Sequence, residues 1–377
     1  MIVFNQTKVL TIAVLAITVV FAGLARAESR TNISIVGSST VYPFATVVAE
    51  RFGKSSSYST PKVESTGSGG GMKLFCGGIG LSYPDITNAS RRIKISEFDA
   101  CQKNGVKEMV EVLIGFDGIV IANSKDAPVM NLTRKDLFLA LAAKVPGFDG
   151  RLINNPYKTW RDVNPELPNI KIEVLGPPPT SGTRDAFVEL AMEGGAKQFP
   201  MLKALRKSKD AEQIKSLMKS LGIPQDYFNK KGKKVFKIVA HGIREDGHFI
   251  EAGENDNLIV QKLQVNPSAL GIFGFSFLDQ NNDKVQGSII EGVKPEFETI
   301  ASKDYPISRP LYFYVKKGHI GLIPGMEGYL SEFSSEKAWS EDGYLSDKGM
   351  IPMSSLLRDH YASAIKNQTV LQRSDLK

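Results

Sequence analysis

Cysteine and histidine are scarce in this chain, and their scarcity limits the chemistry that it can perform. Its 377 residues include two cysteines and four histidines. A structural zinc site needs several ligands at suitable spacing, and no such residues flank Cys76 or Cys101. The turn TGSGG (66–70) has threonine where the G-x-S-x-G elbow of one class of serine hydrolases requires glycine. The residue composition and motifs therefore give little support for a zinc-binding protein or a serine hydrolase.

Long apolar runs are also missing, apart from one at the N-terminus. The segment VLTIAVLAITVVFAGLA (9–25) follows Lys8 and leads into Ala25-Arg26-Ala27. This arrangement predicts a cleavable signal peptide over residues 1–27, with the mature chain beginning at Glu28. A transmembrane anchor is the alternative, but the run is short and its small-residue ending favours cleavage. We therefore expect a soluble protein exported to the periplasm.

No strong charge of one sign marks the chain. The formal net charge is +7, and it falls to +5 when Lys8 and Arg26 leave with the signal peptide. The cluster NKKGKKVFK (229–237) is interpreted as solvated charge on a loop or hairpin. An exported protein rarely meets nucleic acid, so a small anionic ligand suits this mild excess better.

The 350 residues that follow the signal peptide are more than one hydrophobic core usually serves, so two lobes are expected. Strand-like and helix-like segments alternate, which is typical of an α/β fold with mostly parallel sheets. The expected strands cover 109–114, 119–122, 170–175, 236–240 and 270–275, and the expected helices cover 134–143, 183–192 and 211–221.

The two cysteines are separated by 25 positions. In an oxidising compartment such a pair most simply forms one disulfide, Cys76–Cys101. Two free buried thiols are the alternative.

The segment ISIVGSSTVYPFATVVAERF (33–52) combines a strand with a helix. Ile33, Ile35 and Val36 read as a strand, and apolar residues recur at helical spacing from Tyr42 onward. Pro43 suits the first turn of that helix. Residues 37–40 then form a turn at a helix N-terminus, where free amides, hydroxyls and the helix dipole favour an oxyanion. An ordinary N-cap is the alternative interpretation.

Three further segments repeat this chemistry. The segment ESTGSGGGMKLF (64–75) adds glycines and hydroxyls after a strand, and DITNASRRIKISEF (85–98) brings Ser90 and two arginines to a turn. The segment GPPPTSGTRDAFVEL (176–190) places Arg184 in a helix's first turn, where a cation opposes the dipole unless an anion lies nearby. In open α/β sheets, turns of this kind line the ligand crevice.

The four motifs GSSTVYP, STGSGGG, DITNASR and TSGTRDAF, in this order, resemble the periplasmic phosphate-binding protein of the phosphate-specific ABC transporter, the PstS family. The segment LGIFGFSFL resembles the family's returning segment. The resemblance implies a type II periplasmic binding protein, in which each lobe is a mixed sheet flanked by helices. It places residues 28–122 and 270–377 in lobe 1 and residues 123–269 in lobe 2.

The resemblance also implies a function. A monomer would capture inorganic phosphate between its lobes and deliver it to the membrane permease of an ABC importer, with no cofactor, metal or reaction. Another tetrahedral oxyanion, such as sulfate, is the alternative ligand, and a secreted phosphatase is a more remote one. The implied phosphate-binding residues are Ser39, Thr40, Val41, Ser68, Ser181, Gly182, Thr183 and Arg184.

The chain departs from the family pattern at two positions. The best-known members carry an aspartate that accepts a phosphate proton where this chain has Arg91, which we include among the site residues. They also take an arginine from the place of Pro177 to Pro179, so Arg184 would have to replace it. Candidates for the missing acceptor are Asp117 and Asp256, and the loop HGIREDGHFIEAGEND (241–256) could contribute Arg244. That loop also gathers His241, His248, Glu245, Asp246 and Glu251, in no spacing that defines a metal site.

Overall fold

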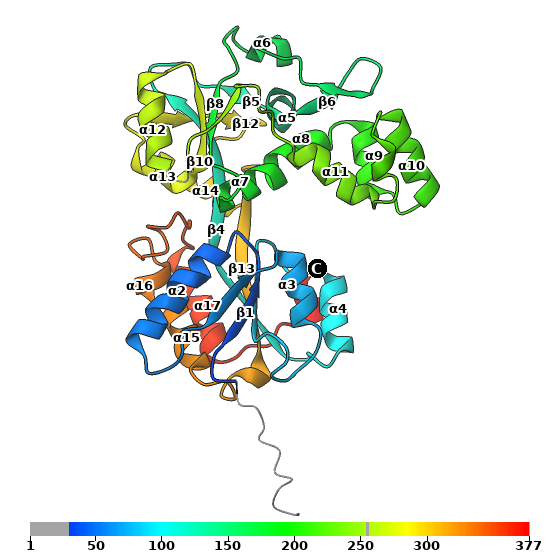
Figure 1. The fold of residues 1–377 in the computed structure, drawn as a ribbon. Coiled ribbons are helices and arrows are strands. Elements are labelled where there is room, and N and C mark those ends of the chain that lie inside the picture. Colours follow the sequence, from blue (N-terminus) through cyan, green and yellow to red (C-terminus); the bar gives the residue numbers. More distant parts are fainter. Residues whose placement is uncertain (1–29, 254–255, 377) are drawn as a thin grey trace, which may run out of the picture.

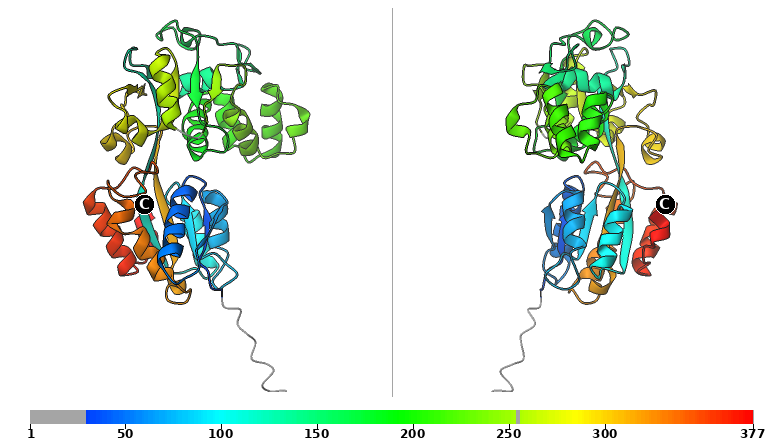
Figure 2. Two further views of the ribbon diagram at one scale, coloured as in Figure 1. Left: turned by 60° about the vertical axis from the view of Figure 1, so that its left-hand side comes forward. Right: turned by 90° about the vertical axis from the view of Figure 1, so that its right-hand side faces the viewer.

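The computed structural model describes residues 30–253 and 256–376, so the expected signal peptide lies outside the described residues. The described chain forms two lobes joined by two long strands, β4 (Met109–Ser124) and β13 (Ser308–Lys316), as Figure 1 shows. Both views in Figure 2 show the lobes as separate bodies at the two ends of these strands. No helix among the described residues is long and apolar enough to span a membrane.

A mixed sheet continues from one lobe to the other through β4. Within the described residues its strand order is β2-β1-β3-β13-β4-β10-β8-β9, with β11 also paired to β4. Antiparallel pairing with β13 covers β4 from Met109 to Gly118, and pairing with β10 begins at Ile119. Because β4 changes partners at this point, its central residues lie between the lobes.

Lobe 1 contains the N-terminal and C-terminal parts of the described chain. Its sheet includes parallel β1–β2 and β1–β3 pairs, and β13 pairs antiparallel with β3 on one side and β4 on the other. Its other elements are β1 (Ser34–Gly37), α2 (Tyr42–Ser55), β2 (Lys62–Ser65), α3 (Ser68–Phe75), β3 (Ile86–Ala89), α4 (Ile95–Lys103), η3 (Lys317–His319), α15 (Met326–Phe333), α16 (Glu336–Trp339), α17 (Ser355–Lys366) and η4 (Arg373–Leu376).

Lobe 2 is formed by the middle of the chain. Its first part comprises β5 (Asn131–Leu132), α5 (Arg134–Leu141), β6 (Lys144–Pro146), β7 (Leu152–Asn154), α6 (Trp160–Val163), β8 (Val174–Gly176), α7 (Gly182–Phe187), η1 (Val188–Met192) and α8 (Glu193–Ala196). Its second part comprises α9 (Pro200–Lys207), α10 (Ala211–Ser220), η2 (Gln225–Tyr227), α11 (Gly232–His241), β9 (Phe249–Glu251), α12 (Asp256–Val265), β10 (Leu270–Gly274), α13 (Phe275–Gln280), β11 (Val285–Gly287), β12 (Ile289–Ile290) and α14 (Phe297–Ala301).

The strand–turn–helix expected over residues 33–52 is confirmed. Strand β1 ends at Gly37, and α2 begins at Tyr42 with Pro43 in its first turn. Phe44, Val48 and Phe52 are buried on one face of α2, as their helical spacing predicts. The core of lobe 1 thus fixes the position of the turn that precedes the helix.

Two glycines allow β1, β3 and α3 to pack very closely. Gly37 has a φ of 132°, and a Cβ added there would lie 2.2 Å from the carbonyl oxygen of Asn88. A Cβ on Gly71 would lie 2.5 Å from the Cα of Gly37. Gly71 of the GSGGG run therefore serves the packing of α3 against β1, rather than the approach to a ligand that the sequence suggests.

The return from lobe 2 to lobe 1 differs from the division expected at residue 270. Strand β10 pairs in parallel with β8, at Leu270–Val174 and Gly271–Leu175, so it belongs to lobe 2. The chain returns at the start of β13, whose residues 312–315 pair with β3. An apolar strand such as 270–275 fits the sheet of either lobe, so its pattern alone does not choose between them. We divide the described chain into lobe 1 (30–118 and 308–376) and lobe 2 (119–307).

The segment 236–240, which was expected to be a strand, lies in helix α11, so that expectation is wrong. The loop or hairpin expected at 229–237 is wrong over residues 232–237, which belong to the same helix. Its β-branched residues suggest a strand, but Val235, Phe236 and Ala240 are buried on one helical face. The expected helices at 134–143, 183–192 and 211–221 appear as α5, α7 with η1, and α10. The disulfide Cys76–Cys101 is confirmed, and no cysteine is free.

Candidate functional site

The turn between β1 and α2 presents unpaired backbone donors at the edge of lobe 1. The amides of Ser39, Thr40 and Val41 have no hydrogen-bond partner within the described residues. The amide of Ser38 donates to the carbonyl of Asn88 at 2.9 Å, and the amide of Tyr42 donates to the carbonyl of Ser38 at 3.0 Å, which fixes both ends of the turn. A fixed turn with free amides at a helix N-terminus can bind an oxyanion.

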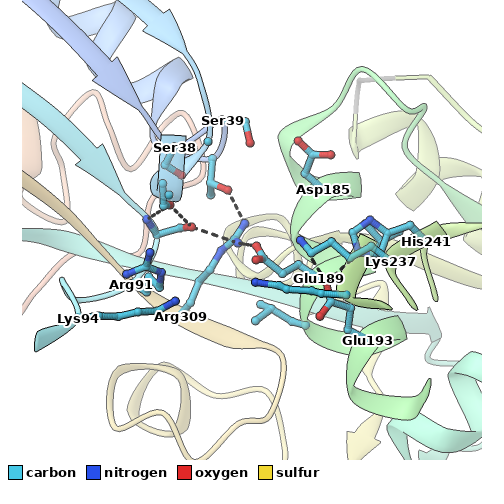
Figure 3. Close-up of a pocket in the computed structure, with 18 of the residues that line it drawn as sticks. Ser38, Ser39, Arg91, Lys94, Asp185, Glu189, Glu193, Lys237, His241 and Arg309 are labelled. Carbon is cyan, nitrogen blue, oxygen red and sulfur yellow. Dashed lines mark hydrogen bonds and ion pairs between the residues drawn. The ribbon is translucent and has the colours of Figure 1, made fainter. Parts of the chain in front are cut away.

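Arg309 at the start of β13 places a buried positive charge beside this turn. Its side chain is 6% exposed, and its Nη2 donates to the hydroxyl of Thr40. Its Nε lies 3.1 Å from a carboxylate oxygen of Asp117 on β4. Its Nη1 lies 2.9 Å from a carboxylate oxygen of Glu189 on η1, as Figure 3 shows. Arg309 therefore connects the turn, the crossing strand β4 and lobe 2.

Two serines complete the lobe 1 side of the site. The hydroxyl of Ser68, the first residue of α3, accepts a hydrogen bond from the amide of Ser90 at 3.0 Å. The two hydroxyls lie 3.1 Å apart, and the Ser90 hydroxyl is 3.4 Å from Nη1 of Arg309. The glycine-rich turn and the turn after β3 therefore meet at Arg309.

The start of α7 approaches the same turn from lobe 2. Ser181 caps this helix by accepting a hydrogen bond from the amide of Thr183 at 3.2 Å. A Cβ added to Gly182 would lie 3.8 Å from the carbonyl oxygen of Ser39 and 3.9 Å from the Cα of Thr40. The structure thus brings the segment 181–183 close to the turn 39–41, although the two are distant in sequence. Residues 181–183 do not line the cleft described below.

Arg91 lines this cleft but is already paired. Its two terminal nitrogens bind the carboxylate of Glu97 at 2.8 and 2.7 Å. The hydrogen bond with Glu97 raises the pKa of Arg91, although partial burial opposes the shift. The charge of Arg91 is thus partly balanced within lobe 1.

Arg184 lies against a different cavity of lobe 2. Its Nη1 donates to the carbonyl of Pro177 at 3.0 Å, and its guanidinium lies 4.5 Å from the ring centre of Phe249. The cavity it lines, of about 630 Å³, also contains Arg244 and Glu251 and does not include the turn 39–41. Burial lowers the pKa of Arg184. The structure therefore does not bring Arg184 together with the other expected site residues.

The other candidates from the 241–256 loop are dispersed. Arg244 is buried and donates to the carbonyls of Ala140 and Tyr157 and to the carboxylate of Asp246. His248 contacts the carbonyl of Ile172 at 2.7 Å. Within the described residues no three His, Cys, Asp or Glu side chains are grouped as metal ligands. Asp256 is the first residue of α12, and its side chain is not among those that the structure describes.

The lobe 2 wall of the cleft is built around Glu193, a carboxylate that is 3% exposed. Its oxygens lie 3.0 Å from Nε2 of His241, 3.3 Å from Lys237, 3.5 Å from Arg206 and 3.8 Å from Lys197. Burial favours the neutral acid, but the His241 hydrogen bond and the lysine charges lower the pKa of Glu193 to about 2. The wall therefore carries more positive than negative charge (Figure 3).

Between the lobes lies a cleft of about 780 Å³. Residues 38–40, Ser68, Ser90 and Arg309 line it from lobe 1, and Glu189 and Glu193 line it from lobe 2. Two α/β lobes, two crossing strands and a polar cleft between them define a two-lobed binding protein, whose ligand is held where the lobes meet.

Comparisons with known proteins place the chain in a family. The model of the PBP superfamily domain matches residues 23–337, so the chain belongs to the PBP superfamily. Protein SphX of Synechococcus elongatus is 29% identical over 294 residues, covering 76% of this chain and 69% of that protein. The phosphate-binding protein PstS of Staphylococcus saprophyticus is 27% identical over 312 residues, covering 81% of this chain and 76% of that protein.

A solved structure supports the fold. The crystal structure of a possible phosphate binding protein from Planctomyces limnophilus matches with a TM-score of 0.65 and 23% identity, covering 90% of this chain and 98% of that chain. The type II periplasmic binding protein fold expected from the sequence is thereby confirmed.

Sequence reasoning missed Arg309 and Glu189. Glu189 lies inside an expected helix, where a carboxylate reads as solvated surface. Arg309 precedes Pro310 and the apolar run LYFYV (311–315), which was not recognised as a strand. A charged residue next to an apolar run with strand-forming residues is the signal that could have identified Arg309.

Proposed function

We propose that this chain is an exported solute-binding protein that captures inorganic phosphate between its lobes and delivers it to an ABC importer of the inner membrane. The observation that carries the proposal is the meeting of a buried cation, Arg309, with the free amides of residues 39–41. Relatives named phosphate-binding protein PstS support the same ligand. The N-terminal apolar run supports export.

Each part of the site has a role in holding a tetrahedral anion. The amides of residues 39–41 and the hydroxyls of Ser39, Thr40 and Ser68 donate from lobe 1, and Ser181, Gly182 and Thr183 donate from lobe 2 on closure. Arg309 supplies a guanidinium that can bind two oxygens at once. We assign the cation to Arg309 because it contacts the turn 39–41 through Thr40. Arg91 instead binds Glu97 through both terminal nitrogens, and Arg184 donates to the carbonyl of Pro177.

Asp117 is the proposed acceptor of the phosphate proton. Its side chain is 14% exposed and contacts the Arg309 guanidinium that would hold the anion. Phosphate at neutral pH keeps a proton that it can donate in a hydrogen bond to the Asp117 carboxylate. Sulfate has no such proton, so its oxygens would face the negative charge of Asp117 without a hydrogen bond. This difference favours phosphate over the alternative, another tetrahedral oxyanion.

The test is calorimetric titration of the mature protein with phosphate and with sulfate. We expect phosphate to bind and sulfate to bind at least tenfold more weakly, and we expect Asp117→Asn to reduce that preference. Tighter binding of sulfate would refute the ligand assignment.

A parallel assay addresses the enzyme alternative. We propose that the protein has no catalytic activity, so incubation with a phosphate monoester should release no phosphate beyond the uncatalysed rate. Sustained turnover would instead support a secreted phosphatase.

A further inference from the structure

The cleft contains more positive charge than a single phosphate site needs. Its lining includes seven Lys or Arg side chains and four Asp or Glu side chains, a net charge of +3. The basic residues are Arg91, Lys94, Lys197, Arg206, Lys233, Lys237 and Arg309, and the acidic ones are Glu97, Asp185, Glu189 and Glu193. Among these basic residues, Arg309 alone has a hydrogen bond to the turn that precedes α2 within the described chain, so most of this charge lies elsewhere in the cleft.

We call Lys94, Arg206, Lys233 and Lys237 the basic vestibule. Lys94 precedes α4 in lobe 1, whereas the other three lie on α9 and α11 of lobe 2. Figure 1 shows α9 and α11 on the same side of the molecule as α3 and α4. The vestibule is therefore made of like charges that face one another from the two lobes.

The carboxylates nearby do not neutralise the vestibule. Glu193 is shared among four basic side chains, and Glu97 is held by Arg91 through both of its oxygens. Neither Lys94 nor Lys233 forms an ion pair with a carboxylate in the part of the chain that the structure describes. Partial burial, followed by the charges of Arg91, Lys233 and Arg206, lowers the pKa of Lys94.

Closure of the lobes would increase this repulsion. Bringing Lys94 nearer to Arg206 and Lys233 brings like charges together while water leaves the cleft, which strengthens their interaction. One phosphate held at Arg309 leaves these charges uncompensated. An anion in the vestibule would compensate them and would favour the closed form.

We propose that the cleft also binds condensed phosphates, which are linear chains of two or three phosphoryl groups. The terminal group occupies the turn 39–41 and Arg309, and the next groups extend into the basic vestibule. A cleft of about 780 Å³ is in the size range of sites for small organic ligands and exceeds what one tetrahedral anion fills. This inference rests on the anion site of the proposed function, which it extends, and not on orthophosphate being the ligand of that site.

The experiment compares orthophosphate, pyrophosphate and tripolyphosphate by calorimetric titration at fixed ionic strength, without divalent cations. The test variant is the double substitution Lys94→Gln and Lys233→Gln. The matched control is Lys103→Gln with Lys219→Gln, which removes one exposed lysine from each lobe outside the cleft lining. All variants are compared by thermal melting to confirm folding.

We expect the parent to bind pyrophosphate at least as tightly as orthophosphate. The test variant should bind pyrophosphate and tripolyphosphate roughly tenfold more weakly, and orthophosphate less than about threefold more weakly, because two charge-assisted contacts to the second group are lost. The control should bind all three like the parent.

Three results would overturn the inference. The parent could bind orthophosphate but not pyrophosphate, the test variant could lose affinity equally for all three phosphates, or the control could lose as much affinity as the test variant. The last two would show that the lysines only raise the local anion concentration. Binding of pyrophosphate without orthophosphate would refute the proposed function and leave the inference standing. Binding of neither would refute both.

Discussion

Glu189 competes with an incoming anion for Arg309, so its replacement should strengthen phosphate binding. The Glu189 carboxylate lies 2.9 Å from Nη1 of Arg309 and reaches it from lobe 2. Phosphate at Arg309 must displace this carboxylate, because Asp117 already occupies another edge of the guanidinium. Glu189→Gln removes the competing charge and keeps the side-chain shape.

The expected gain in phosphate affinity follows from how far the Glu189–Arg309 ion pair is exposed to solvent. The Glu189 side chain is 49% exposed, whereas that of Arg309 is 6% exposed, so solvent screens the pair on one side. Pairs of this kind contribute about 0.2 to 1 kcal/mol. We therefore expect Glu189→Gln to tighten phosphate binding by a factor of about 1.4 to 5. The unliganded protein should lose no more than about 1 kcal/mol of unfolding free energy.

Calorimetric titration with phosphate at pH 7 provides the measurement. Glu212→Gln is the matched control, since Glu212 lies on α10, is 82% exposed and pairs only with Lys215 among the described residues. It makes the same charge change away from the cleft and should leave affinity unchanged. Weaker binding by Glu189→Gln would refute the competition and would show that Glu189 itself holds the phosphate proton.

Three further predictions concern the whole molecule. The bond Cys76–Cys101 closes a loop with a sequence separation of 25, so its removal by Cys→Ser substitution should cost about 3 kcal/mol of unfolding free energy in denaturant titration; an unchanged midpoint would contradict this. Burial lowers the pKa of Lys316 to about 8, whereas the unfolded chain keeps that proton to about 10.5. The unfolding free energy should therefore rise by about 2 kcal/mol between pH 8 and pH 10, and Lys316→Met should abolish the rise. Phosphate should reduce the radius of gyration in small-angle scattering, since the lobes close about β4 and β13; identical profiles with proven binding would exclude that motion.

Local features of the fold were predictable from the sequence. The pattern from Ile33 to Phe52 predicts the strand, turn and helix, because each depends on neighbours within a few residues. The disulfide was predictable because only two cysteines are present. The start of α7 was predictable from the Ser-Gly-Thr sequence at 181–183.

The centre of the site was not predictable by the same reasoning. Arg309 meets Thr40, Asp117 and Glu189 across 269, 192 and 120 positions of the sequence, respectively. These contacts depend on the pairing of β13 with β4, and neither periodicity nor motif spacing encodes that pairing. Arg184 follows a recognisable motif, yet its orientation is set by Phe249 and the Pro177 carbonyl. Tertiary contacts therefore decide which arginine faces the cleft.

The most direct test of the account compares Arg309→Gln with Arg184→Gln in calorimetric titration with phosphate, with thermal melting of each unliganded variant as the control for folding. Arg309→Gln should weaken phosphate binding by about 2 to 4 kcal/mol, because it removes a buried charge-assisted contact. Arg184→Gln should bind phosphate like the parent, because Arg184 lines an adjoining cavity that does not include the turn 39–41. Parent-like binding by a folded Arg309→Gln protein, together with loss of binding by Arg184→Gln, would contradict the central claim.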